Sequence, residues 1–265
     1  MAHILITNDD GIQAEGLRAL VQAVQGLGTI SVVAPAHERS AAAQSLTLRH
    51  PIFWDQVAEH EWSVEGTPAD CVILALNKLL PQRPDIVISG VNRGGNLGEN
   101  IFYSGTVGAA MEGAINHIPA IAVSAVHRGR VFRFDQAAKL ARDLAQMALV
   151  EGMPLGTMLN VNVPQLWNGN VRMTRQSKKV TRNVLQEGTD PRGRNFFWLL
   201  EQEHIEGLDP QSDYAAVFDG AASITPLHLD RTHEISLDHL SQWASKLESD
   251  AENEEPATVA RKSLK

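Results

Sequence analysis

Apolar and polar positions follow two different periods in the first half of the chain. Short, mostly apolar runs of the kind that form buried strands occupy residues 3–7, 29–34, 85–89 and 120–125. Between them, residues 15–25, 67–80, 106–116 and 134–150 carry apolar side chains at helical spacing. Apolar strands that alternate with helices are typical of parallel strands buried under helices on both faces. The pattern therefore predicts an α/β fold with a doubly wound, mostly parallel sheet of the Rossmann-like type.

The second half has a less regular pattern. Residues 157–163, 171–174 and 195–200 resemble strands, residues 239–247 a last helix, and the stretch from 200 to 226 turns and short pieces. We expect a single domain over residues 1–247 with a β-rich extension in its second half. Residues 248–265 are polar, lack aromatic side chains and contain a proline, so this tail is expected to be disordered.

Composition narrows the class of protein. Of the 265 residues, 43% are hydrophobic and 20% charged, and the formal net charge is −8, which argues against binding to nucleic-acid polymers or anionic membranes. The single cysteine, Cys71, cannot form an intramolecular disulfide, which fits a reducing compartment. No signal peptide is apparent, and the longest apolar run, residues 71–76, is too short to span a bilayer. We expect a cytoplasmic protein.

Two adjacent carboxylates follow the first predicted strand. Asp9 and Asp10 repel each other there, and a divalent cation with a preference for oxygen ligands, such as Mg²⁺ or Mn²⁺, would offset that repulsion. The alternative is an ordinary surface turn, because Asn, Asp and Gly all favour turns. The position of the pair at a strand end makes the two interpretations about equally good, since ligands of such sheets bind at the carboxyl ends of the strands.

Three further segments carry candidate chemistry. Ser40, beside Arg39, follows the second strand and could ligate a metal, but without other evidence a plain polar loop is the better interpretation. The glycine-rich loop 90–105 contains Asn92 and Asn96, whose amides can meet a cation or a phosphate; its alternative is a flexible loop. Ser104, Gly105 and Thr106 open a helix, where an anion site and a simple helix cap can coexist.

Several mechanisms lack their motifs. The chain contains no Gly-x-Ser-x-Gly, no Gly-x-x-x-x-Gly-Lys-Ser/Thr and no Gly-x-Gly-x-x-Gly sequence. The histidines form no tight pair typical of a zinc site, and Cys71 lies in an apolar helical stretch that favours a core position.

Taken in order, the motifs resemble the survival protein E (SurE) nucleotidases of bacteria from Ile4 to about Leu229. The matching segments are residues 4–11, 33–35 with 39–40, 66–71, 89–92, 96–98, 103–107, 160–164, 190–193 and 223–227. One departure is Ala41, where the family usually has glycine after its ligand serine.

The resemblance implies a SurE-like fold and metal-dependent hydrolysis of nucleoside 5′-monophosphates, with some members also acting on 3′-nucleotides and short polyphosphate. It implies one divalent cation per subunit, held by Asp9, Asp10, Ser40 and Asn92, and a phosphate held by Asn96, Ser104, Gly105 and Thr106. The same likeness implies a homodimer or homotetramer, in which subunits exchange a β-rich arm located within about residues 165–235.

A mechanism follows from these assignments. The cation would offset phosphate charge and activate a water, with Asp9 or Asp10 steering that water or accepting its proton. Two rivals remain: a sugar-nucleotide transferase, which would release a nucleotide, and a nucleotide sensor, which would bind a monophosphate and leave it intact. The carboxylate pair argues against the sensor, because an anion binder gains little from negative charges unless a cation is present.

Overall fold

The computed structural model describes residues 1–127, 133–178, 181–203 and 208–253 and divides into two compact units, Met1–Leu229 and Asp230–Lys265. The sheet of the first unit contains β1 (Ala2–Thr7), β2 (Gly28–Pro35), β3 (Trp54–Ala58), β4 (Glu61–Val64), β5 (Ile86–Arg93), β6 (Ala120–Val126), β7 (Thr157–Pro164), β8 (Val171–Met173) and β11 (Ala222–His228). Its main helices are α1 (Glu15–Val24), α2 (Pro68–Leu74), α3 (Gly105–Ile115) and α4 (Asp135–Glu151). The predicted strands and helices of the first half are thereby confirmed to within a few residues.

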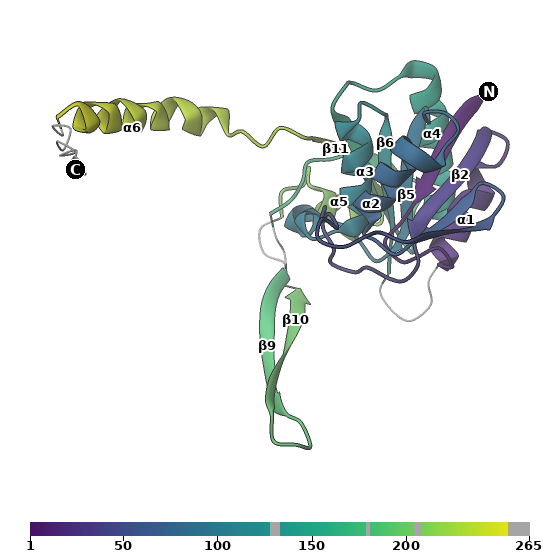
Figure 1. Cartoon of the computed structure of the whole chain (residues 1–265), viewed down its shortest axis with the longest axis horizontal. Coiled ribbons are helices and arrows are strands. Elements are labelled where there is room, and N and C mark those ends of the chain that lie inside the picture. Colours follow the sequence, from purple (N-terminus) through teal and green to yellow (C-terminus); the bar gives the residue numbers. More distant parts are fainter. Residues whose placement is uncertain (128–132, 179–180, 204–207, 254–265) are drawn as a thin grey trace, which may run out of the picture. The chain divides into compact units, whose positions relative to one another are not determined.

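The nine strands lie in the order β3-β4-β2-β1-β5-β6-β7-β11-β8. The six neighbouring strands β4, β2, β1, β5, β6 and β7 run parallel to one another, and Figure 1 labels β2, β5 and β6 among them. From β1 the chain first moves toward β2 and later returns to β5 on the other side, so the winding direction reverses between β1 and β5. Alternate residues of β1 enter two separate apolar clusters: Ile4 and Ile6 pack with α1 and α4, while Leu5 packs with α2 and α3. The predicted doubly wound, mostly parallel α/β sheet is confirmed.

The glycine-rich segment 90–105 is more ordered than the predicted loop. The strand β5 continues through Arg93, with a register shift against β6 between Ser89 and Asn92. Gly90 allows this irregularity, because a Cβ there would lie 2.3 Å from the carbonyl oxygen of Val123. A short 3₁₀ helix, η2 (Gly98–Phe102), then leads into α3.

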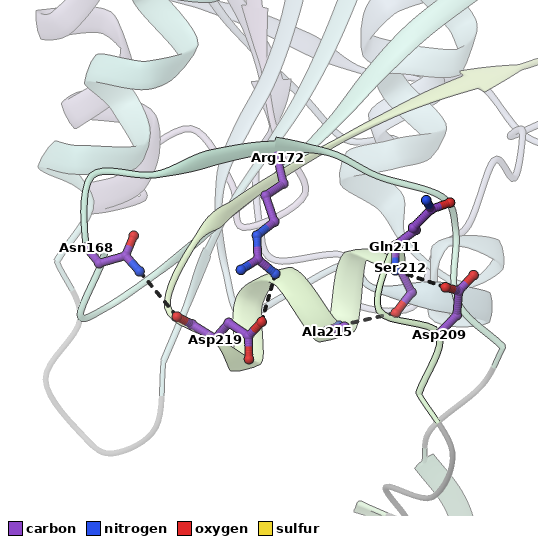
Figure 2. Close-up of polar contacts among 7 residues, drawn as sticks. All are labelled: Asn168, Arg172, Asp209, Gln211, Ser212, Ala215 and Asp219. Atoms are coloured by element: carbon purple, nitrogen blue, oxygen red, sulfur yellow. Dashed lines mark hydrogen bonds and ion pairs between the residues drawn. The ribbon is translucent and has the colours of Figure 1, made fainter.

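The second half confirms three predicted strands and adds elements that the sequence pattern did not predict. The strands predicted at residues 157–163, 171–174 and 195–200 are β7, β8 and β10 (Asn195–Glu203). The strand β10 pairs with β9 (Thr181–Thr189), which was not predicted, in a separate two-stranded hairpin within the range expected for an arm. A short helix, α5 (Asp213–Phe218), packs on β11, where only turns and short pieces were expected. Figure 2 shows that side-chain contacts fix both ends of α5. The hairpin β3–β4 was also not predicted.

In the second unit, α6 (Glu234–Asn253) is longer than the helix predicted at residues 239–247. It covers residues 248–253, where disorder was expected, and residues 254–265 of that expected tail lie outside the described part of the chain. No helix among the described residues combines the length and apolarity needed to cross a membrane.

Candidate functional site

The candidate residues meet at the carboxyl ends of β1 and β5, where the sheet reverses its winding. Asp9 and Asp10 follow β1, Ser40 follows β2, and Asn92 lies near the end of β5. This crevice is the expected ligand site of an open α/β sheet. The turn after β1 is held by Asn8, whose side chain donates to the carbonyl of Gly11 at 2.9 Å and accepts from its N–H at 3.2 Å.

Asp9 is almost fully buried and closely held by α3. Its side chain accepts a hydrogen bond from the Thr106 hydroxyl at 2.5 Å, and its backbone carbonyl accepts one from the N–H of Arg39 at 2.8 Å. Burial raises the pKa of Asp9 from 3.8 to about 6; the bond from Thr106 opposes that rise and the charge of Asp10 adds to it. Gly105 makes this approach possible, because a Cβ there would lie 2.8 Å from the Asp9 Cβ.

Asp10 and Asn92 face the same cavity from neighbouring strands. One carboxylate oxygen of Asp10 accepts the backbone N–H of Arg93 at 3.1 Å. Partial burial raises the pKa of Asp10, the hydrogen bond from Arg93 lowers it, and the nearby Glu38 carboxylate raises it again. The Asn92 amide donates to the carbonyl of Gly94 at 2.9 Å, so the amide oxygen stays available as an acceptor.

Ser40 is more loosely held. Its side chain is exposed, and its hydroxyl donates to the Glu38 carboxylate at 2.5 Å. The following residue, Ala41, has a φ of 57°, in the left-handed region that favours glycine. Ser40 lines the same cavity as the aspartates, and the backbone that carries it is strained at Ala41.

Asn96 and Ser104 are both held by hydrogen bonds within the protein. Asn96 is buried; its N–H donates to the Asn162 side chain at 2.8 Å, and its amide nitrogen donates to the Ser124 hydroxyl at 2.8 Å. Asn160 and Asn162 both donate to the Asn96 carbonyl, at 2.8 and 3.0 Å. The Ser104 hydroxyl caps α3 by accepting the N–H of Val107 at 3.1 Å, which leaves its own proton available to a ligand.

One cavity of about 770 Å³ joins most of the predicted site residues. Its lining includes Asp9, Asp10, Ser40, Asn92, Asn96 and Ser104. The lining does not include Gly105 or Thr106; the hydroxyl of Thr106 is directed at Asp9 instead. It does include Glu38, Asn100 and Glu201, which sequence reasoning did not select, and Tyr103, which was noted only as part of the motif 103–107. Glu38 had a usable signal, since it lies two residues before Ser40.

The donor set fits a hard divalent cation. Two carboxylates, an amide oxygen and a hydroxyl are the oxygen ligands that such ions prefer, and both carboxylates have pKa values raised by burial, which a positive charge would relieve. Among the described residues, no group of three or more His, Cys, Asp or Glu side chains is placed to hold a metal, so this site would rely on neutral oxygens beside its carboxylate pair.

Known proteins are similar to this chain in sequence and in fold. The profile of the family described as Survival protein SurE matches residues 4–183. The chain belongs to the SurE family. Its relatives include a protein from Geotalea daltonii named 5′-nucleotidase SurE, 45% identical over 91% of this chain and 98% of that protein. A protein of the same name from Geobacter metallireducens is 46% identical over 91% of this chain and 96% of its own. A SurE crystal structure from Aquifex aeolicus superposes with a TM-score of 0.81 at 39% identity, covering 93% and 99% of the two chains.

The SurE assignment covers all the candidate segments after β1, β2 and β5 and at the start of α3. The resemblance inferred from motifs is therefore confirmed, and so is the α/β fold that it implied.

Proposed function

We propose that this SurE chain is a metal-dependent 5′-nucleotidase that hydrolyses nucleoside 5′-monophosphates to nucleoside and phosphate. The observation that carries the proposal is the adjacent pair Asp9 and Asp10, partly or fully buried at the switch point beside the first turn of α3. The names of the close relatives support the same reaction. Hydrolysis of 3′-nucleotides and short polyphosphate is a further activity that the same phosphate chemistry would allow.

Asp9, Asp10 and Asn92 would hold one divalent cation, Mg²⁺ or Mn²⁺, with Ser40 as a fourth ligand once its hydroxyl leaves Glu38. When bound, the cation offsets the negative charge of the phosphate and activates water for attack. Thr106 keeps the Asp9 carboxylate in a fixed orientation, and the N–H of Arg93 does the same for Asp10. Asp9 or Asp10 would accept the proton of the attacking water.

Asn96 and Ser104 would contact the phosphate oxygens. The second N–H of the Asn96 amide and the hydroxyl proton of Ser104 both remain after their structural hydrogen bonds are made. Gly105 and Thr106 contribute through Asp9, because one permits its close approach and the other donates to it. The opening of α3 adds the positive end of the helix dipole to this edge of the cavity.

The protein would act as a homodimer or homotetramer. The β9–β10 hairpin exposes large apolar side chains, including Leu185, Phe197, Trp198 and Leu199, which a neighbouring subunit would cover. A cytoplasmic location is part of the proposal, since the only cysteine is buried and no intramolecular disulfide is possible.

Phosphate release from AMP tests the reaction. Purified protein is assayed first with EDTA and then with excess Mn²⁺ or Mg²⁺, and release is expected only with the metal. Asp9→Asn should abolish release at saturating metal. Glu15→Gln removes one negative charge from the same cavity lining and should retain activity.

Each rival function has its own outcome in this assay. AMP that binds and stays intact with metal present would favour the sensor. A nucleotide that is released from a sugar nucleotide, while AMP is not consumed, would favour the transferase.

A further inference from the structure

Asp213 is a fully buried carboxylate outside the cavity, in the first turn of α5. It accepts three backbone N–H groups: from Gly98 at 2.8 Å, from Ser177 at 3.1 Å and from Tyr214 at 2.7 Å. Gly98 belongs to the loop between β5 and α3, and Ser177 lies between β8 and β9 at the root of the hairpin. A single side chain therefore joins the loop of the candidate site to the root of the hairpin.

The position of Asp213 is fixed from the side of α5. The Ser212 hydroxyl caps this helix by accepting the N–H of Ala215 at 3.2 Å, and Arg172 forms an ion pair with Asp219 at the other end at 2.8 Å (Figure 2). Asn168 adds a hydrogen bond to the carbonyl of Asp219 at 3.2 Å. With both ends of α5 held, the carboxylate serves as a fixed point against which the loop is located.

Gly98 is enclosed by the hairpin root. Its φ of 55° and its surroundings both require glycine, since a Cβ would lie 2.5 Å from the Ser177 hydroxyl and 2.9 Å from the carbonyl of Lys178. Its carbonyl accepts the Gln176 side chain at 3.2 Å. Side chains outside the loop thus form hydrogen bonds with both the N–H and the carbonyl of Gly98.

The loop that Gly98 anchors carries the groups assigned to the phosphate. Asn96 precedes Gly98 by two residues, and the 3₁₀ helix that starts at Gly98 leads directly to Ser104. The loop is held at Asn96 by the side chains of β6 and β7 and at Gly98 by Asp213. The proposed cation ligands Asp9 and Asp10 lie in the turn after β1, and Asn92 belongs to β5, so none of them is held by this second anchor.

We propose that Asp213 is a positioning residue, which holds the loop 94–104 so that Asn96 and Ser104 meet the phosphate and which ties that geometry to the root of the β9–β10 hairpin. The proposal rests on the proposed function for the identity of the substrate. The proposed role concerns phosphate alone: Asp213 affects the affinity for phosphate and leaves the affinity for the cation unchanged.

Asp213→Asn is the informative variant. An amide of the same size replaces one acceptor oxygen with a donor, so at least one of the three N–H groups loses its partner. We expect KM for AMP and the Kd for inorganic phosphate of the Mn²⁺-loaded protein to rise by about tenfold or more, since hydrogen bonds to charged groups are of that strength. The kcat should stay within about threefold, and Mn²⁺ affinity, measured by calorimetry, should match that of the wild type.

A matched control separates positioning from simple loss of stability. Asp70 is also a buried carboxylate that accepts two backbone N–H groups, from Thr67 at 2.9 Å and Thr47 at 3.1 Å, but neither belongs to the loop 94–104. Asp70→Asn should lower the melting temperature and leave the phosphate Kd within about twofold of the wild type, because none of its hydrogen bonds reaches that loop. If Asp213→Asn does not fold, Gln176→Ala removes only the contact to the Gly98 carbonyl and should weaken phosphate binding in the same direction.

Direct phosphate binding keeps this test independent of the nucleotidase reaction. Wild-type protein that binds phosphate but does not hydrolyse AMP would refute the proposed function, while a weakened phosphate Kd in Asp213→Asn would still support positioning. An unchanged phosphate Kd in both Asp213→Asn and Gln176→Ala, or a parallel loss of Mn²⁺ affinity, would overturn the role of Asp213.

Discussion

At the scale of single residues, ionisation of the buried Asp9 lowers the free energy of unfolding, and a bound cation would offset this loss. Its pKa is raised from 3.8 to about 6, so the folded metal-free protein binds more protons than the unfolded chain between these values. Stability should therefore fall as pH rises through this window, by about 3 kcal/mol when a shift of roughly two units is converted at 1.36 kcal/mol per unit.

Urea unfolding of EDTA-treated protein at pH 4 and pH 7.5 measures this cost. Relative to wild type, Asp9→Asn should gain most of that free energy at pH 7.5 and little at pH 4, and Mn²⁺ should stabilise only the wild type at pH 7.5. A difference between the two proteins that does not change with pH would contradict the assignment of the shift to Asp9.

Ala41 gives a second prediction at this scale. An alanine at a φ of 57° costs about 1 kcal/mol relative to glycine, so Ala41→Gly should raise the free energy of unfolding by roughly 0.5–1 kcal/mol. The neighbouring Ala42 is not among the positive-φ residues, and Ala42→Gly should instead destabilise by a similar amount. Denaturant unfolding of both variants checks the signs, and two losses would show that residue 41 bears no strain.

The site residues whose location could be predicted from the sequence are those that lie at the end of a strand. Asp9, Asp10 and Asn92 could be located from the sheet alone, because the carboxyl ends of parallel strands meet at one edge. The role of Thr106 could not be read in this way. A threonine in the first turn of a helix suits an anion, and only the packing of α3 on the β1 turn makes that anion the side chain of Asp9.

At the scale of elements, the strands β3 and β11, which the sequence did not predict, lack a regular pattern of apolar residues. Every residue of β3 is exposed, and β11 contains Ser223, Thr225 and Pro226, which resemble a turn. The proline is tolerated because the pairing of β8 with β11 ends at Ile224, two residues before Pro226. No strand on that side therefore needs the missing N–H. Apolar periodicity therefore predicts the buried central strands, and it fails at the exposed edge strand β3 and at β11, whose buried residues are partly polar.

The close contact between α3 and the β1 turn leads to a prediction about the helix. Gly105→Ala would place a methyl 2.8 Å from the Asp9 Cβ and should push the start of α3 away from the carboxylate. Mn²⁺ affinity should fall at least tenfold, of the order seen when groups that support metal ligands are removed.

Gly113→Ala is the control on the same helix, since its methyl would meet the Val87 side chain at 2.9 Å, on β5 before the register shift and away from the aspartates. It should destabilise the protein without changing Mn²⁺ affinity, as measured by calorimetry and thermal unfolding. Equal Mn²⁺ affinities in the two variants would show that α3 does not position Asp9.

At the scale of the whole molecule, the β9–β10 hairpin is the feature that a single chain does not explain. A two-stranded hairpin is marginally stable in water, and this one is apolar on both faces. Leu185 and Leu199 pair on one face, while Trp198 packs edge-on against Phe196 on the other. Trp198 and Leu199 are 62% and 66% exposed, and this area must be covered by another surface if the hairpin is to persist.

Trp198→Glu tests whether a second copy provides that cover. Trp198 does not line the cavity, so a charge at this position acts on the hairpin surface and not on the candidate site. The molar mass from light scattering should fall toward that of a monomer of 28.9 kDa. Leu155→Glu introduces the same charge at an exposed leucine far from the hairpin in sequence and should leave the mass unchanged. If the mass of Trp198→Glu equals that of wild type, the hairpin does not hold the oligomer together, and the exposed apolar face would have to bind a different partner.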